Sequence, residues 1–161
     1  QYLECKYDGW ALHWMTDEDK AKMQSVTTWL RFFEGGTQHY DLRCYHPYNM
    51  QARALVCRSK PHHYVELDER DGLREAVSNL DSLDFVGIVE HYQASLCLFS
   101  AKTQPGRPLP AYCDCTDEAA WAAFASTHVS HKAPPHSMGN LTQEDRGLIA
   151  ELTKIDRPLY A

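Results

Sequence analysis

The sequence has no long hydrophobic run, because no stretch approaches the roughly eighteen apolar residues that cross a membrane. It shows no signal peptide, no internal repeat and no low-complexity segment. The 161 residues carry a formal charge of −6, so the basic footprint of a nucleic-acid-binding protein is also missing. These absences argue against a nucleic-acid partner and against membrane contact by the chain itself. The 43% of hydrophobic residues favours one globular domain, or a part of one.

Complete local motifs for catalysis are missing as well. Gly35-Gly36 has neither the lysine nor the following serine or threonine with which a P-loop binds phosphates. No Gly-x-Ser-x-Gly elbow is present, which argues against a hydrolase of that type. The catalytic residues therefore stay unknown from motifs alone.

Cysteine is well represented, with six residues at positions 5, 44, 57, 97, 113 and 115. An even number permits three disulfides, but the pairing cannot be read from sequence. Asn140-Leu141-Thr142 matches the acceptor pattern for N-glycosylation, a tripeptide that is also common by chance. Together these features indicate an oxidising compartment of the secretory pathway.

A zinc site is the first metal hypothesis to weigh. Cys113 and Cys115, followed by His128 and His131, supply two thiols and two imidazoles, a set that binds zinc tetrahedrally. However, one residue separates the cysteines, where roughly two to four are usual. A disulfide between them would be strained for the same reason. No metal site is therefore predicted, and each cysteine is expected to pair elsewhere or to stay free.

Hydrophobic periodicity predicts three longer helices. One covers residues 17–34, with Met23, Val26, Leu30 and Phe33 on one face, and one covers residues 68–80, with Asp68 as its cap. The third follows the capping box Thr142-Gln143-Glu144-Asp145 and should end before Pro158. A turn entering a short helix is expected over residues 49–55, and a helix capped by Thr116 should run through Trp121 and Phe124.

The stretch from Phe85 to Val89 is short, apolar and β-branched, which predicts a strand covered on both faces as in a parallel sheet. From Glu90 the pattern becomes helical, with no turn residue between the two elements. The order helix, strand, helix indicates a piece of an α/β domain.

Several blocks, in order from residue 49 to residue 161, resemble the carbohydrate sulfotransferases, the Golgi enzymes related to heparan sulfate 2-O-sulfotransferase. Each block is weak alone, and the ordered set carries the resemblance. The blocks are Asn49-Met50-Gln51-Ala52-Arg53-Ala54-Leu55, Leu73-Arg74-Glu75-Ala76-Val77-Ser78-Asn79-Leu80, Phe85-Val86-Gly87-Ile88-Val89-Glu90 with Ser95-Leu96-Cys97-Leu98, His128-Val129-Ser130-His131-Lys132, and Ile155-Asp156-Arg157-Pro158-Leu159-Tyr160.

This resemblance implies an α/β fold, namely the C-terminal portion of a P-loop-type sulfotransferase domain, rich in helices and with few parallel strands. The family's phosphate loop lies upstream of these blocks, and its Arg-x-Pro-x-x-Arg-x-x-Ser motif is commonly followed by a residue and a tyrosine. Since the chain opens Gln1-Tyr2, residues 1–161 are expected to form one partial domain that lacks the N-terminal donor-binding part. Because the chain does not begin with methionine, a missing signal or anchor says little about the parent protein.

The implied reaction transfers a sulfuryl group from 3′-phosphoadenosine-5′-phosphosulfate (PAPS) to a glycan hydroxyl in the Golgi lumen, by a parent that is membrane-anchored. No metal is required, and the isolated chain should be inactive. The acidic balance mildly disfavours a heavily sulfated acceptor.

The resemblance also implies donor-binding residues. Lys132 supplies a charge and Ser130 a hydroxyl for the donor phosphates, with a solvated loop as the alternative. Arg53 either contacts the nucleotide or forms a structural ion pair. Glu90 either caps the following helix or contacts donor or acceptor, and Gly87 allows a neighbouring backbone to pack closely. The two histidines of the Ser130 loop depart from the family pattern.

Two other classes remain open. One is a small secreted binding module, stabilised by disulfides or zinc, without catalysis. The other is a degenerate sulfotransferase-like protein that binds without turnover.

Overall fold

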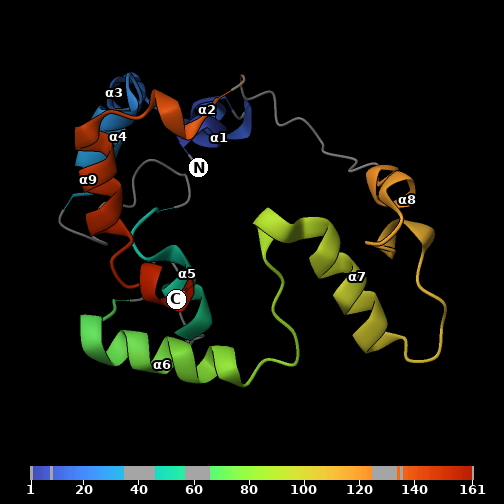
Figure 1. Cartoon of the computed structure of the whole chain (residues 1–161). Coiled ribbons are helices and arrows are strands. Elements are labelled where there is room, and N and C mark those ends of the chain that lie inside the picture. The colour runs from blue at the N-terminus through green and yellow to red at the C-terminus, as the bar shows by residue number, and fades with distance from the viewer. Residues whose placement is uncertain are drawn as a thin grey trace. The chain divides into compact units, whose positions relative to one another are not determined.

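The computed structural model describes residues 2–7, 9–34, 46–56, 66–124, 134 and 136–160, without the side chains of residues 4 and 9–11. The chain forms two compact units (Figure 1). Unit 1 combines Gln1–Asp81 with Ser130–Ala161, and unit 2 is Ser82–Val129. The described residues form helices, turns and irregular segments, and none of them lies in a β-strand. Within this part of the chain, no helix has the length and apolar character needed to span a membrane.

The helices of unit 1 fall in two stretches of sequence. The first stretch contains α1 (Tyr2–Tyr7), α2 (Gly9–Trp14), α3 (Asp17–Lys22), α4 (Val26–Phe32), α5 (Met50–Val56) and α6 (Glu69–Asp81). The second contains the 3-10 helix η4 (Met138–Asn140), α9 (Gln143–Leu152) and the 3-10 helix η5 (Arg157–Tyr160). Unit 2 contains η2 (Val89–His91), α7 (Tyr92–Thr103), η3 (Ala111–Cys113) and α8 (Glu118–Ala122).

The helix predicted over residues 17–34 is in fact two helices, because a second capping residue interrupts it. Thr16 and Asp19 form a capping box at the start of α3. The Ser25 hydroxyl then accepts a hydrogen bond from the backbone N–H of Thr28 at 3.0 Å, and this bond begins α4. Serine competes for backbone hydrogen bonds in a helix interior and is favoured as a cap, which explains the break.

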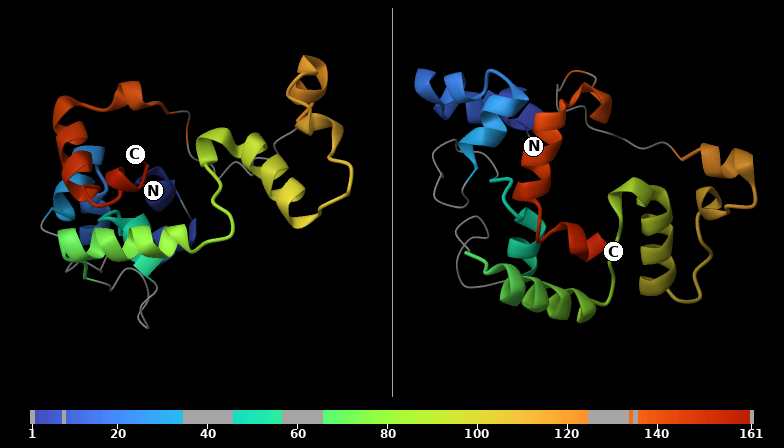
Figure 2. Two further views of the ribbon diagram at one scale, coloured as in Figure 1. Left: turned by 60° about the horizontal axis from the view of Figure 1, so that its bottom comes forward. Right: turned by 60° about the vertical axis from the view of Figure 1, so that its left-hand side comes forward.

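One hydrophobic cluster joins α4 to α9. Its centre is Trp29 and Phe33, whose rings lie 5.1 Å apart edge to face. Leu152 of α9 is buried in the same cluster, and the views of Figures 1 and 2 show α9 alongside α4. The predicted face of residues 17–34 is therefore confirmed as core at most positions. The buried members are Cys5, Met15, Met23, Trp29, Leu30, Phe33 and Leu152.

A second cluster lies between α5, α6 and the end of the chain. Its buried members are Ala52, Val56, Ala76 and Ile155. The predicted cap of α6 is confirmed, because the Asp68 carboxylate accepts hydrogen bonds from the N–H groups of residues 70 and 71, both at 3.0 Å. The short helix predicted after Asn49 is also confirmed as α5.

The strand predicted from Phe85 to Val89 is wrong. Residues 85–88 have no regular structure, and Val89 begins the 3-10 helix η2. The Ser95 hydroxyl accepts from the N–H of Ile88 at 2.9 Å and donates to the Ile88 carbonyl at 3.0 Å. The two backbone groups with which Ile88 would pair to a neighbouring strand are therefore bonded to Ser95 instead. A β-strand needs a neighbouring strand to hydrogen-bond its backbone N–H and carbonyl groups. Here a side chain of α7 provides these hydrogen bonds. Val89 remains 81% exposed.

In the rest of unit 2, α7 matches the helix expected after Glu90, and residues 104–110 form a loop. A disulfide joins Cys97 of α7 to Cys113 of η3. The cap of α8 is Asp117 rather than Thr116, because Asp117 accepts from the N–H of Ala120 at 3.0 Å. The Thr116 hydroxyl donates to Asp114 instead, at 2.6 Å. This helix ends at Ala122, before the predicted Phe124.

Candidate functional site

Asn49 is the first residue of a buried polar centre in unit 1, which we call the Asn49–Asp156 centre and which comprises Asn49, Arg53 and Asp156. The φ angle of Asn49 is +43°, in the left-handed region that asparagine tolerates better than most residues. Its N–H donates to the carbonyl of Leu152 at 2.8 Å, and its side-chain Oδ1 accepts from the N–H of Ile155 at 2.8 Å. Asn49 therefore holds the end of α9 against the start of α5.

Asp156 caps α5 from the opposite end of the sequence. Its carboxylate accepts hydrogen bonds from the backbone N–H groups of Ala52 at 2.8 Å and of Gln51 at 3.3 Å. Negative charge is favoured at this end of a helix, where the N–H groups have no partner within the helix. Burial raises the pKa of Asp156, although these N–H groups and the charge of Arg53 act in the opposite direction.

Arg53 is the third member of the centre and is fully buried. One terminal nitrogen of its guanidinium donates to the carbonyl of His46 at 2.9 Å. The His46 ring is also buried and packs edge to face on Phe33, with the ring centres 4.6 Å apart. Because a buried cation requires a nearby anion or acceptor, Asp156 and the His46 carbonyl together explain how Arg53 is accommodated.

Three of the five blocks that resemble sulfotransferases meet around this centre. The block from Asn49 forms α5, the block from Leu73 lies in α6, and the closing block contains Asp156. Asn79 of α6 donates through Nδ2 to the carbonyl of Leu55 at 2.9 Å, which satisfies an acceptor at the end of α5. The same three segments form the second hydrophobic cluster. Residues more than 100 positions apart thus share one polar and apolar core.

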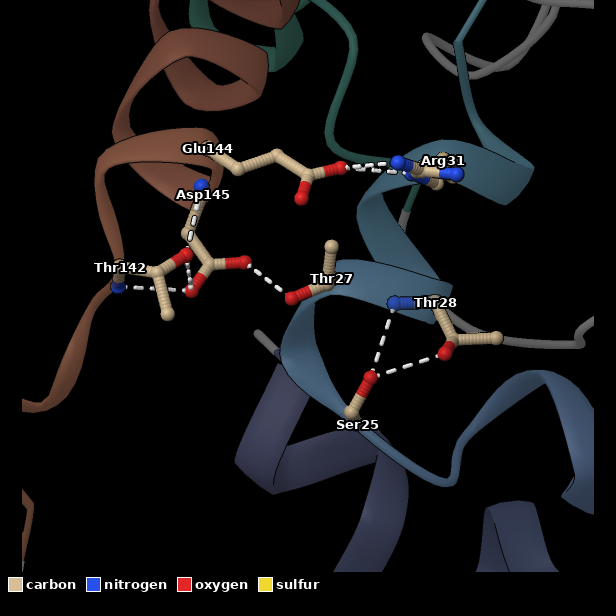
Figure 3. A network of polar contacts seen from close by, with 7 residues as sticks. All are labelled: Ser25, Thr27, Thr28, Arg31, Thr142, Glu144 and Asp145. Atoms are coloured by element: carbon tan, nitrogen blue, oxygen red, sulfur yellow. Dashed lines mark hydrogen bonds and ion pairs between the residues drawn. The ribbon is translucent and has the colours of Figure 1, made fainter.

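A second polar network joins α4 to α9 at the surface of unit 1 (Figure 3). The Thr142 hydroxyl caps α9 by accepting from the N–H of Asp145 at 3.1 Å, so the predicted capping box is confirmed. Asp145 in turn accepts from the Thr27 hydroxyl at 2.6 Å. Nearby, Arg31 forms an ion pair with Glu144.

Asp145 is buried, as Asp156 is, but the pKa of its carboxylate is shifted in the other direction. Burial alone would raise its pKa. Hydrogen bonds from Thr27 and Thr142 outweigh this effect, so the pKa of Asp145 lies below its ordinary value. The contrast arises because two hydroxyls and one N–H group stabilise the ionised form of Asp145.

The predicted donor-binding residues are not brought together in the part of the chain that the structure describes. Ser130 and Lys132, with His128 and His131, lie outside that part. Arg53 is buried and engaged by a backbone carbonyl, which favours the structural alternative for its role. Of the four residues weighed above as a zinc set, Cys113 is bonded through its sulfur to Cys97, in line with the expectation that each cysteine pairs elsewhere or stays free.

Glu90 and Gly87 are both described, and neither has the expected surroundings. Glu90 is exposed in η2, and no side-chain hydrogen bond caps η2 or α7 at its N-cap residue. A Cβ at Gly87 would meet the side chains of Phe85 and Ser95, each at 3.3 Å, rather than a neighbouring backbone. Glu90 thus lies in the first turn of η2, where negative charge is favoured, but no capping hydrogen bond by its side chain is found among the described residues.

The roles of Asp156 and Asn49 could not be found by reading the sequence locally. Asp156 stands 104 residues from the helix that it caps, so no pattern within one element indicates the pairing. A weak signal exists for Asn49, because an asparagine directly before a helical run is typical of a turn with positive φ. The chemistry of this centre is structural, since its charged groups are buried and satisfy backbone groups.

Searches of family models, of curated proteins and of solved structures found no match to this chain.

Proposed function

We propose that this chain is the C-terminal part of a carbohydrate sulfotransferase that transfers a sulfuryl group from PAPS to a glycan hydroxyl. The observation that supports this proposal is the joining of three resemblance blocks around the Asn49–Asp156 centre. Asn49 of the first block and Asp156 of the last block each accept a hydrogen bond from a backbone N–H group of the other block. Arg53 of the first block donates to a backbone carbonyl of the preceding segment. A shared structural role is a physical reason for such residues to recur together in one family.

The reaction breaks the bond between sulfur and the bridging phosphate oxygen and forms a new bond between sulfur and the acceptor oxygen. A base removes the acceptor proton, and cationic groups stabilise the charge that develops on the phosphate of the leaving 3′-phosphoadenosine-5′-phosphate. In this proposal Lys132 and Ser130 contact the donor phosphates. Arg53 supports the fold around the site and does not touch the nucleotide, because it is buried and bonded to the carbonyl of His46.

The test is a transfer assay on the protein encoded by the complete transcript that contains residues 1–161, made in a secretory host. Labelled PAPS and a panel of glycans are supplied, and the KM for PAPS is measured for Lys132→Ala and for Lys102→Ala. Lys102 is a matched control, because it is an exposed lysine in the last turn of α7. We expect Lys132→Ala to raise this KM about tenfold, which corresponds to roughly 1.4 kcal/mol of lost binding, and Lys102→Ala to leave it unchanged.

Equal KM values for the two variants would contradict the donor-binding role of Lys132. Absence of transfer to every glycan, with PAPS bound, would favour the degenerate protein that binds without turnover. Absence of both binding and transfer would favour the secreted binding module, whose disulfide form is compatible with the Cys97–Cys113 bond. The 161-residue chain assayed alone should give no turnover, and turnover by it would show that the donor-binding part is not missing.

A further inference from the structure

Asn140 begins a tripeptide that the proposed function leaves unexplained. Of the three asparagines in the sequence, at positions 49, 79 and 140, only Asn140 is followed at the second position by serine or threonine. Leu141 stands between them, and the pattern requires only that this residue is not proline. Any N-linked glycan on this chain must therefore be attached at one position.

The Asn140 side chain is exposed, and its amide group has a defined orientation. Asn140 ends the 3-10 helix η4. Its Oδ1 accepts from the backbone N–H of Ser137 at 3.1 Å and from the Ser137 hydroxyl at 2.8 Å. The Nδ2 atom, which carries the glycan in N-glycosylated proteins, forms no hydrogen bond within the described residues. The acceptor nitrogen is thus available while the carbonyl oxygen fixes the turn.

The segment that carries Asn140 is held firmly in unit 1. Arg146, the fourth residue of α9, donates to the carbonyl of Met138 at 2.6 Å. This hydrogen bond joins η4 to the N-terminal part of α9. Asp145 joins the same part of α9 to Thr27 of α4 (Figure 3). A substituent on Nδ2 would therefore project from a fixed position on the surface. Met138 beside it is 65% exposed, and a glycan at Asn140 would cover part of this apolar side chain.

Thr142 is both the third residue of the acceptor tripeptide and the N-cap of α9. Residues 141 and 142 have extended backbones, with ψ angles of 133° and 168°, and both follow Asn140 before α9 begins. In the folded chain the Thr142 hydroxyl donates to the Asp145 carboxylate at 2.7 Å and accepts from its N–H group. Since the hydroxyl is engaged once α9 has formed, a glycan at Asn140 would have to be added before α9 forms.

We infer that Asn140 carries an N-linked glycan, added while the chain enters the secretory pathway and independent of whether the protein is a sulfotransferase. The Nδ2 atom displaces the pyrophosphate of a lipid-linked oligosaccharide from C1 of its first sugar, and a bond forms between Nδ2 and C1. Nδ2 loses one proton, and the lipid pyrophosphate leaves. The disulfide between Cys97 and Cys113 supports the required compartment, because disulfides persist where glycans are added.

The experiment expresses residues 1–161 behind a cleavable signal peptide in eukaryotic secretory cells. Purified protein is treated with an amidase that removes N-linked glycans in heavy-oxygen water, which converts the glycosylated asparagine to labelled aspartate. We expect a loss of mass on treatment and the label at position 140. Wild-type protein that is secreted with its Cys97–Cys113 bond formed but without label at Asn140 would overturn the inference.

Three variants separate glycosylation from folding. Asn140→Asp keeps an oxygen that accepts the hydrogen bonds from Ser137 but removes the nitrogen to which the glycan is attached. This variant should therefore carry no glycan. Thr142→Asn keeps a capping residue for α9 and removes the hydroxyl of the pattern, with the same expected result. Thr142→Ser keeps both the cap and the pattern and should be glycosylated. A glycan that persists in Asn140→Asp, or is lost in Thr142→Ser, would contradict the inference.

Discussion

The two units of this chain are stabilised in different ways. In unit 1 the described residues include eleven of the twelve buried hydrophobic side chains, and polar groups from residues 46–53 and 152–156 satisfy one another. In unit 2 the one buried hydrophobic residue among those described is Cys97, and its sulfur is in a disulfide. Cys5 of unit 1 is also disulfide-bonded, so a cross-link is common to both units. The difference is that unit 1 adds many buried side chains and long-range hydrogen bonds, whereas the described part of unit 2 adds mainly local contacts.

The local contacts of unit 2 centre on Gln93. Its Nε2 donates to the carbonyls of Tyr112 at 2.7 Å and Trp121 at 2.9 Å, so one side chain joins α7 to both η3 and α8. The Tyr112 and Phe124 rings lie 5.2 Å apart. A small unit with few buried apolar side chains gains little from the hydrophobic effect, and cross-links then carry more of its stability. The comparison predicts that perturbations should remain confined to one unit.

The largest effect should come from Arg53→Met in unit 1. This change leaves Asp156 without a nearby cation and the His46 carbonyl without its donor. Arg53 and Asp156 are buried charges that act on each other electrostatically, and removing one of two such charges costs up to about 3–5 kcal/mol. Urea unfolding followed by tryptophan fluorescence in a Trp121→Phe background measures the free energy of unfolding, since the other tryptophans belong to unit 1.

Arg74→Met is the matched control for that measurement. Arg74 is exposed on α6 and pairs with Asp71 at 3.0 Å, a surface ion pair worth at most about 1 kcal/mol. Equal losses of stability in the two variants would contradict the buried role of Arg53.

The second effect should come from replacing Cys97 and Cys113 by serine in one variant. The disulfide closes a loop with a sequence separation of 16, and loss of such a cross-link costs roughly 3 kcal/mol. Hydrogen–deuterium exchange should accelerate over residues 92–122 and stay unchanged in α4, α5 and α9. Faster exchange in α9 would show that the two units do not unfold separately.

Two helix caps, one in each unit, allow a matched comparison of smaller effects. Thr142→Ala removes the cap of α9, and Asp117→Ala removes the cap of α8. Each loss should cost about 1 kcal/mol of helix stability. In unglycosylated protein, Thr142→Ala should lower the free energy of unfolding of unit 1, because α9 is part of its core. Asp117→Ala should increase hydrogen exchange only near α8. A global loss of stability in the second variant would argue against independent units.

The smallest expected effect is a difference in pH dependence between Asp145 and Asp156, two of the three buried aspartates described in unit 1. The lowered pKa of Asp145 contributes stability that is present above about pH 4 and is lost as the pH falls through its folded pKa. The raised pKa of Asp156 contributes stability below about pH 4 that is lost as the pH rises through its folded pKa.

Unfolding curves at a series of pH values test these signs. From pH 3 upward, the stability of wild type relative to Asp145→Asn should increase. The stability of wild type relative to Asp156→Asn should decrease as the pH rises from 3. Parallel curves for wild type and both variants would show that neither carboxylate is linked to folding.

Sequence reasoning predicted those features of the fold that are decided within a few residues. The caps at Asp68 and Thr142 were predicted correctly, because each cap and its N–H partners lie within three positions. The break at Ser25 was missed, since the apolar face continues across it and only the serine marks the new start. The strand at residues 85–89 was predicted from composition, whereas a strand depends on a neighbour that composition does not reveal.

The site was less predictable than the fold. Arg53 was identified as a residue of interest, but its burial and its bond to the His46 carbonyl depend on how distant segments pack. Asp156 belonged to a recognised block without an assigned role, because its partners lie 104 and 105 residues earlier. The α/β class and the donor contacts of Ser130 and Lys132 stay predictions.

The capping of α5 by Asp156 sets an order of events during synthesis. Residues 50–56 are synthesised about 100 residues before Asp156. During that interval α5 has no cap from Asp156, and the Asn49 side chain has no contact with the segment after α9. The cross-link of unit 2 spans far fewer residues and can close earlier. The unit with the smaller core should therefore be completed first, and the larger core should close only after residue 156 has been made. A chaperone that acts on this chain during synthesis would meet α5 without its cap until residue 156 has been made.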